Sequence, residues 1–135
     1  MEAQSLILAL NETRKTLLAS RLLLSHGPGA RPASLAASIL PGDGVWMDDC
    51  NHIDTTGTQA ALDLVFLDAA HRVVAVVSNL RPGIACPRVE DAVGVLQLAA
   101  GTIELSKTKK GDQVALEPIV PRPVQEAAAV RASRN

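Results

Sequence analysis

The clearest feature of the hydrophobic pattern is a pair of nearly continuous apolar runs in the middle of the chain. LDLVFL (62–67) and RVVAVVS (72–78) are rich in β-branched residues, and four residues separate them. Two such runs around a short polar connection predict a β-hairpin with Asp68 as a turn residue at its tip. Because both runs are apolar at nearly every position, we expect a central hairpin that is covered on both faces.

Further strands are predicted on either side of this hairpin, over residues 4–10, 92–98 and 113–116. A short helix is expected over residues 103–107, because Thr102 can cap its first turn. The strands therefore outnumber the helices.

A longer helix is predicted near the N-terminus, over residues 12–24. Asn11 is a favourable N-cap, and Glu12 places a negative charge in the first turn. Leu18 and Leu22 then share one face. The following segment, residues 26–44, is rich in glycine and proline, and we expect a long surface loop with one helical turn inside it.

These elements predict an α+β fold: a strand-dominated, barrel-like and mostly antiparallel sheet with one N-terminal helix and one or two short helices. A chain of 135 residues fits one globular domain, which we place over residues 1–117. Residues 118–135 contain three prolines and no apolar face worth burying, so we expect a mobile tail.

The composition excludes several classes of protein. Hydrophobic residues make up 47% and charged residues 20%, which excludes disorder over most of the length. The net charge of −1 gives no overall attraction for nucleic acid, and Trp46 and Phe66 are the only aromatic residues. We therefore expect no nucleic-acid partner, and no phosphate-binding glycine pattern points to a nucleotide or other cofactor.

No apolar stretch approaches the roughly 20 residues that cross a bilayer, so we expect no membrane insertion. The run Leu6–Leu10 is too short for a signal peptide, and the chain is expected to be cytoplasmic, although a removed leader would leave no trace. In a reducing compartment Cys50 and Cys86 are expected to be two thiols, with a disulfide as the alternative.

The densest polar chemistry lies in residues 46–59, between the proline-rich segment and the hairpin. The candidate binding residues are Trp46, Asp49, Cys50, His52, Asp54 and Asp63. Trp46 either lines a pocket or anchors the packing of the core strands. Asp63 begins an apolar strand, and a carboxylate there is either a functional group or, as we favour, a structural acceptor for backbone N–H groups of the preceding loop.

Two chemical interpretations of this segment are open. Asp48, Asp49, His52 and Asp54 carry the side chains that bind divalent ions, although no Cys-x₂-Cys pair indicates a structural zinc site. Cys50 and His52 would share one face of a strand, but no further pattern completes a nucleophilic set. We assign no catalytic residue and no metal ligand, and we favour a polar loop that presents itself to a partner.

Four blocks resemble the prokaryotic family called domain of unknown function 192. They are CNHIDTTGTQAALDLVFLD (50–68), RVVAVVSNLRPG (72–83), VLQLAAGTIELS (95–106) and KKGDQVAL (109–116). The blocks recur in the family's order with compatible spacing. The resemblance implies a compact, barrel-like sheet with flanking helices and no established activity.

The chain departs from this family's pattern in the polar segment. Asp54 stands where the family has His, Thr56 and Thr58 stand where it has Phe and Met, and Gln59 stands where it has Arg. Cys50, Thr55, Gly57 and Asp63 keep the family's residue types.

The sequence thus predicts an uncharacterised, non-enzymatic binding or interaction domain that uses the 46–59 loop for an unknown protein or small-molecule partner. The alternative is a metal-assisted enzyme with its site around Asp48, Asp49, His52 and Asp54.

Overall fold

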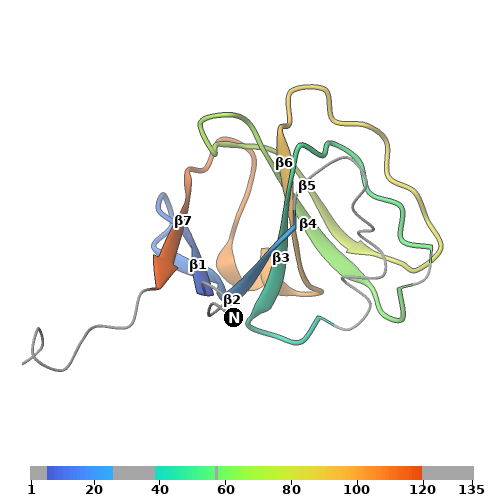
Figure 1. The fold of residues 1–135 in the computed structure, drawn as a ribbon, viewed down its shortest axis with the longest axis horizontal. Helices are drawn as coiled ribbons and strands as arrows, with labels where there is room; N and C mark the ends of the chain where they lie inside the picture. The colour runs from blue at the N-terminus through green and yellow to red at the C-terminus, as the bar shows by residue number, and fades with distance from the viewer. Residues whose placement is uncertain (1–5, 26–38, 57, 120–135) are drawn as a thin grey trace, which may run out of the picture.

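A computed structural model of the chain describes residues 6–25, 39–56 and 58–119. Its elements, in chain order, are β1 (Leu6–Asn11), β2 (Thr16–Ser25), β3 (Asp43–Asp48), β4 (Leu62–Leu67), β5 (Val73–Leu80), β6 (Gly94–Ala99), α2 (Thr102–Ser106) and β7 (Val114–Ile119). Figure 1 shows the strands wrapping around a common interior, with the short helix near one end.

The strands form one sheet in the order β5-β4-β6-β3-β2-β1-β7. All neighbouring pairs are antiparallel except β2 and β3, which are parallel. The sheet curls until its two ends meet: Arg72 bridges Gln113, and the Val73 N–H donates to the Asp112 carbonyl at 2.8 Å. The predicted strand-dominated, barrel-like and mostly antiparallel sheet is confirmed as a curled half-barrel with very little helix.

The predicted N-terminal helix over residues 12–24 is wrong. Residues 12–15 form a tight turn, and β2 follows it and pairs with β1. The Asn11 side chain does accept a hydrogen bond from the Arg14 N–H (3.0 Å), as an N-cap would. However, Lys15 adopts a positive φ of 61°, which turns the chain back along β1. Pairing with an apolar strand therefore overrides the local helix propensity.

The central hairpin is confirmed as β4 and β5, and Asp68 accepts hydrogen bonds from the Ala70 and Arg72 N–H groups at 3.0 and 2.9 Å. The expected burial on both faces is right for β4, whose six residues are all buried. It is wrong for β5, which ends the sheet and has Val74 to Val77 only partly buried. An end strand has a neighbour on one side only.

The remaining predicted elements are largely present. β1, β6 and β7 overlap the strands predicted at 4–10, 92–98 and 113–116. The short helix forms, but Gly101 is its N-cap and no side chain caps it from that position. β7 continues to Ile119, so the first two residues of the tail predicted over 118–135 belong to the sheet, and residues 120–135 lie outside the described residues.

The segment 26–44 was expected to be a loop, but β3 begins at Asp43 within it. Residues 26–38, and with them most of the expected helical turn, lie outside the described residues.

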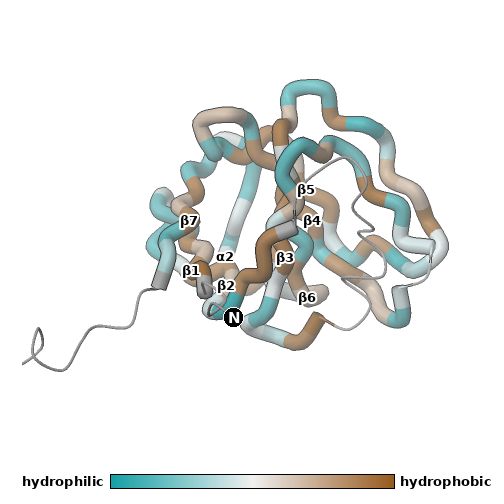
Figure 2. The backbone as a smooth tube through the Cα atoms, in the orientation of Figure 1, coloured by the Kyte–Doolittle hydropathy of each residue, from teal (hydrophilic) through white to brown (hydrophobic). Residues whose placement is uncertain are grey.

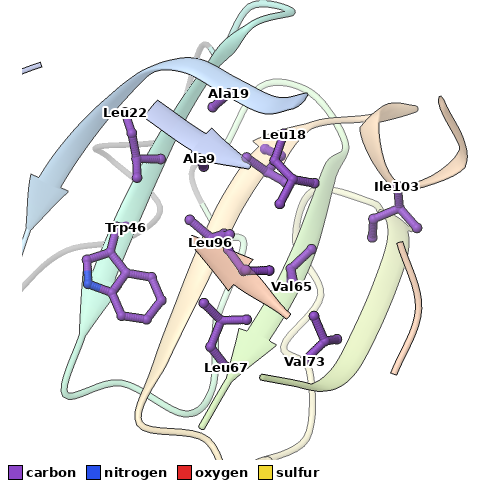
Figure 3. Packing of buried hydrophobic residues seen from close by; sticks show 12 residues of the cluster. Ala9, Leu18, Ala19, Leu22, Trp46, Val65, Leu67, Val73, Leu96 and Ile103 are labelled. Atoms are coloured by element: carbon purple, nitrogen blue, oxygen red, sulfur yellow. The ribbon is translucent and has the colours of Figure 1, made fainter. Parts of the chain in front are cut away.

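The core has two layers, one on each face of the sheet. The inner face, shown in Figure 3, carries a cluster that includes Trp46, Val65 and Leu96. The outer face carries a second cluster, in which Phe66 packs with Ile53 and Cys86 from two loops. Alternate residues of a strand point to opposite faces, so strands buried on both faces are apolar throughout. Figure 2 shows this as brown strands joined by paler or teal turns.

Gln97 is the exception within the buried strands. It lies on β6 in register with Val45 and Leu64, and its side chain is fully buried. Neither its amide nitrogen nor its amide oxygen has a hydrogen-bond partner. Leaving such groups without partners in an apolar layer costs about 1–3 kcal/mol.

Replacing this amide with an apolar side chain of similar size should therefore stabilise the fold. We expect Gln97→Met to raise the free energy of unfolding by about 1–2 kcal/mol, measured by urea denaturation. Gln113→Met is the matched control, because the Gln113 amide donates to the Ala70 carbonyl at 2.7 Å and its loss should lower stability. A loss of stability in Gln97→Met would contradict the assignment of an unpaired amide.

A buried polar network joins the β1–β2 turn to the turn before β7. The Asn11 amide donates to Thr108 Oγ1 (2.9 Å) and to Asp112 Oδ2 (3.0 Å). The Arg14 guanidinium and the Lys109 N–H also donate to Asp112 Oδ2, both at 3.0 Å. Burial raises the pKa of Asp112, but these hydrogen bonds outweigh burial, so its pKa lies below its ordinary value.

This carboxylate should make the fold sensitive to acid. A pKa lowered on folding contributes stability that is fully present above the unfolded value near pH 4 and is lost as the pH falls through the folded pKa. We expect Asp112→Asn to lower the free energy of unfolding at pH 7 by about 1–3 kcal/mol and to flatten its decline below pH 4. Urea denaturation from pH 7 to pH 3 measures both effects. Glu104→Gln, at an exposed site on α2, should leave the slope unchanged.

Candidate functional site

Two loops lie side by side over the outer face of the sheet: residues 49–56, the first outer loop, and residues 81–93, the second outer loop (Figure 1). Backbone hydrogen bonds join them along their length. The Cys86 N–H donates to the Ile53 carbonyl (2.9 Å), and the Val89 N–H donates to the Asn51 carbonyl (2.8 Å). The predicted 46–59 loop therefore starts later than expected, because Trp46 to Asp48 belong to β3.

Thr55 fastens the far end of the first outer loop. Its hydroxyl lies 2.7 Å from the carbonyls of both Arg81 and Ile84, and it accepts a hydrogen bond from the Ile84 N–H at 2.8 Å. The Thr55 carbonyl accepts from the N–H groups of Thr58 (3.1 Å) and Gly83 (3.1 Å). The residue is fully buried, so these bonds satisfy its polar groups without water.

The near end of the first outer loop opens into a pocket of about 210 Å³. Asp49, Cys50 and Asn51 line one side, and Ala92 and Val93 of the second outer loop line the other. Asp49 is exposed and has a positive φ of 57°, which turns the chain away from β3 into the pocket wall. The pocket thus combines a carboxylate, a thiol and an amide with a small apolar wall.

Asp48 ends β3 and is not one of the lining residues: alternation along the strand puts it on the inner face with Trp46, opposite Val45 and Met47. Its Oδ1 atom is buried and has no hydrogen-bond partner. Since Asp49 is the next residue along the chain, two carboxylates lie at the end of β3. The Asp48 Oδ1 atom therefore lacks a hydrogen-bond donor.

The two cysteines are both free thiols, so the expected pair of thiols is confirmed. Cys50 is partly buried, and Cys86 is 7% exposed. Burial raises the pKa of the Cys50 thiol, and a hydrogen bond to the His52 carbonyl opposes that effect only in part. Cys50 is therefore a neutral thiol at physiological pH.

His52 and Asp54 both point to solvent, away from the inner core. His52 is exposed, and its Nδ1 lies 3.5 Å from the Asn51 side-chain oxygen. Asp54 Oδ1 accepts from the hydroxyl of Thr56 (2.7 Å) and from the Thr56 N–H (2.9 Å). These hydrogen bonds lower the pKa of the Asp54 carboxyl. The arrangement is a polar turn that satisfies itself.

The proposed metal ligands do not converge. Within residues 39–56 and the other described ranges, no group of three or more His, Cys, Asp and Glu side chains could hold a metal ion. A divalent ion needs at least three such ligands at 2.0–2.6 Å. The metal-assisted alternative therefore has no ligand set in this part of the chain.

Trp46 and Asp63 lie in the core and do not reach the pocket. The Trp46 indole packs so tightly on Gly94 that a Cβ there would come within 2.2 Å of the ring, and the ring meets His71 edge-on at 5.6 Å. Trp46 is thus a packing anchor. Asp63 accepts from the N–H groups of Asn79 (2.8 Å), Gly101 (3.1 Å) and Ile103 (2.8 Å). Its role is structural, but its donors are not those of the preceding loop as we expected.

Sequence reasoning missed three of the five residues that line the pocket. Asn51, Ala92 and Val93 carry no motif, and Ala92 and Val93 were assigned to a strand that in fact begins at Gly94. Only the antiparallel approach of the second outer loop brings them to Asp49, and one sequence contains no signal of that approach.

Fold and site together define a small half-barrel domain with a layer of two loops on its outer face. The model of the DUF192 family, described as an uncharacterised ACR, matches residues 44–116. This chain belongs to that family, in agreement with the sequence resemblance. No curated protein matches the chain.

Two solved structures share this fold. One is a protein of Sinorhizobium meliloti 1021, provisionally described as a transcription regulator; it is 17% identical, with a TM-score of 0.66 over 84% of this chain and 94% of that chain. The other is a protein of unknown function from Novosphingobium aromaticivorans DSM 12444, 18% identical, with a TM-score of 0.64 over 82% of this chain and 83% of that chain. At these identities the likeness is one of fold alone.

No helix within the described residues is long and apolar enough to cross a membrane.

The fastening by Thr55 predicts how the loops respond to its loss. We expect Thr55→Val to lower the free energy of unfolding by about 1–2 kcal/mol, because the backbone groups of Arg81 and Ile84 lose the buried Thr55 hydroxyl as their partner. The amides of Gly83 and Ile84 should exchange with solvent about tenfold faster. Thr56→Val, at the exposed neighbouring position, should change stability by less than about 0.5 kcal/mol. Equal effects of the two substitutions would contradict this role of Thr55.

Proposed function

We propose that this chain is a non-enzymatic binding domain that uses the 46–59 segment, and within it the pocket at Asp49, Cys50 and Asn51, to hold a cationic group of a partner. The observation that carries the proposal is the pocket itself, which is formed by two hydrogen-bonded loops that cover the sheet, where the residues of β4 and β6 are all buried. A site formed on such a support needs little reorganisation when a ligand binds.

The charges around the pocket favour a cation. Asp48 and Asp49 lie at the end of β3, and Glu90 and Asp91 precede the two lining residues of the second outer loop. The same loop carries two cations, Arg81 and Arg88, and neither of them lines the pocket. An amine or guanidinium group supplies N–H donors that the Asp49 carboxylate, which lines the pocket, can accept.

The same charges disfavour a nucleic acid. Carboxylates repel the phosphates of a nucleic acid. One structural relative is provisionally described as a transcription regulator, but the residues that line the pocket of this chain include no basic side chain. A turnover mechanism also lacks support, because the Cys50 thiol is neutral and its hydrogen-bond partner is the His52 carbonyl, which is not a base.

A titration followed by backbone amide NMR tests this proposal with the full chain. The probes are the methylamides of N-acetyl-lysine and N-acetyl-arginine, which represent a protein side chain, and ethylamine, which represents a small amine. N-acetyl-glutamine methylamide is the uncharged control. We expect the cationic probes to shift the amides of residues 49–51 and 92–93.

Asp49→Asn should weaken binding of the cationic probes about two- to fivefold, as expected for one partly solvated ion pair. Glu104→Gln removes the same charge far along the chain and should leave the affinity unchanged. Equal shifts with the uncharged probe, or shifts outside the pocket, would refute a cation site here.

A further inference from the structure

The two cysteines contact opposite sides of a single peptide group. The Cys50 thiol donates to the His52 carbonyl at 3.1 Å, and the Ile53 N–H donates to Cys86 Sγ at 3.3 Å. That carbonyl and that N–H belong to the same peptide unit. The dimensions of a peptide unit then place the two sulfurs within roughly 9 Å of each other.

The two thiols differ in access. Cys50 lines the open pocket, whereas Cys86 is 7% exposed and packs in the outer core cluster. A small reagent therefore reaches the Cys50 sulfur from solvent more readily than the Cys86 sulfur. By access alone, Cys50 is the thiol that would react first with a small disulfide, and Cys86 is the thiol that would resolve the mixed disulfide.

We propose that Cys50 and Cys86 form a redox pair that reacts with a small-molecule disulfide, such as oxidised glutathione, and rearranges the pocket wall. The reaction of the two thiols is argued from their positions. Its effect on ligand binding rests on the binding function proposed above.

The reaction balances as two thiol–disulfide exchanges. The Cys50 thiolate attacks one sulfur of the small disulfide, whose S–S bond breaks and releases one small thiol. The Cys86 thiolate then attacks Cys50 Sγ, the mixed disulfide breaks, and the second small thiol leaves. The protein loses two hydrogens to the two released thiols, so the protein is oxidised and the small disulfide is reduced.

The new bond must displace the peptide group between the sulfurs. A disulfide holds its sulfurs about 2 Å apart, so the two cysteines close over the His52–Ile53 unit. The Ile53 N–H then loses its sulfur acceptor, and the His52 carbonyl loses its thiol donor. Since Asn51 of the pocket adjoins this unit, the pocket wall has to move with it.

The raised pKa of Cys50 gives the reaction a direction with pH. The thiolate is the attacking species, and burial reduces its population near neutral pH. Oxidation should therefore accelerate as the pH rises from 7 toward 9.

Intact-mass analysis of the full chain tests the pair. The reduced protein is incubated with oxidised glutathione at pH 8 under native conditions, and the remaining thiols are alkylated with iodoacetamide. We expect the wild-type chain to lose the mass of two hydrogens and to take up no alkyl group, because no free thiol remains. Cys86→Ser should stop at one glutathione adduct, and Cys50→Ser should stay free of glutathione over the same period.

Backbone amide NMR of the oxidised monomer supplies the structural readout. We expect shifts centred on Asn51 to Ile53 and on Cys86, with the amides of β4 unchanged. A wild-type chain that stops at the glutathione adduct, that closes its disulfide only in urea, or that keeps its loop shifts after closure overturns the proposal. So does a Cys50→Ser chain that reacts as fast as the wild type.

The lysine probe separates this proposal from the binding function. We expect the affinity of the wild type for this probe to fall at least threefold on oxidation. The affinity of Cys50→Ser should be the same before and after the same treatment. A probe that fails to bind the reduced protein refutes the binding function, and the mass and amide readouts still decide the redox pair. An unchanged affinity after closure refutes the regulation of the pocket.

Discussion

The carboxylate of Asp63 is the constraint on which one end of the half-barrel depends. β4 and β5 fall out of register opposite it, between Leu62 and Leu64, and Asn79 adopts a positive φ of 57° there. Asp63 Oδ1 takes the N–H of Asn79, while Oδ2 takes two N–H groups at the start of α2. The three backbone N–H donors offset the cost of burying the carboxylate. The same group thus closes a bulge and positions the helix that covers the interior.

The two faces of the sheet handle polar groups differently. On the outer face, Thr55 satisfies the backbone of two loops with one hydroxyl, and its neighbours at the rim remain free to meet solvent. On the same face, the buried amide of Gln97 has no hydrogen-bond partner. The loop layer is therefore held from its far end by Thr55, and the pocket end is left with fewer internal bonds. The proposed cation site lies at this less constrained end.

The central part of the fold could be predicted from the sequence because its signals are local. β4 and β5 are apolar runs around a tight turn, and Asp68 closes that turn with its own backbone neighbours. Asn11 favoured the wrong prediction of a helix for an equally physical reason: its hydrogen bond from the Arg14 N–H is the same in a turn as in a helix cap. Only the strand partner decides between them. The pocket depends on Val93 and other residues over forty positions away from Asp49, so no local pattern could disclose it.

The departures from the family pattern fit this division of the loop. Where the pattern has His and Phe, this chain has Asp54 and Thr56, and those two residues bind each other through Asp54 Oδ1. The hydrogen bonds from Thr56 lower the pKa of the Asp54 carboxyl, which makes that carboxylate a weaker base. The substitutions therefore turn that end into a structural corner. Asp49 and Cys50 lie at the other end of the loop, in the pocket and next to the peptide that the two thiols flank.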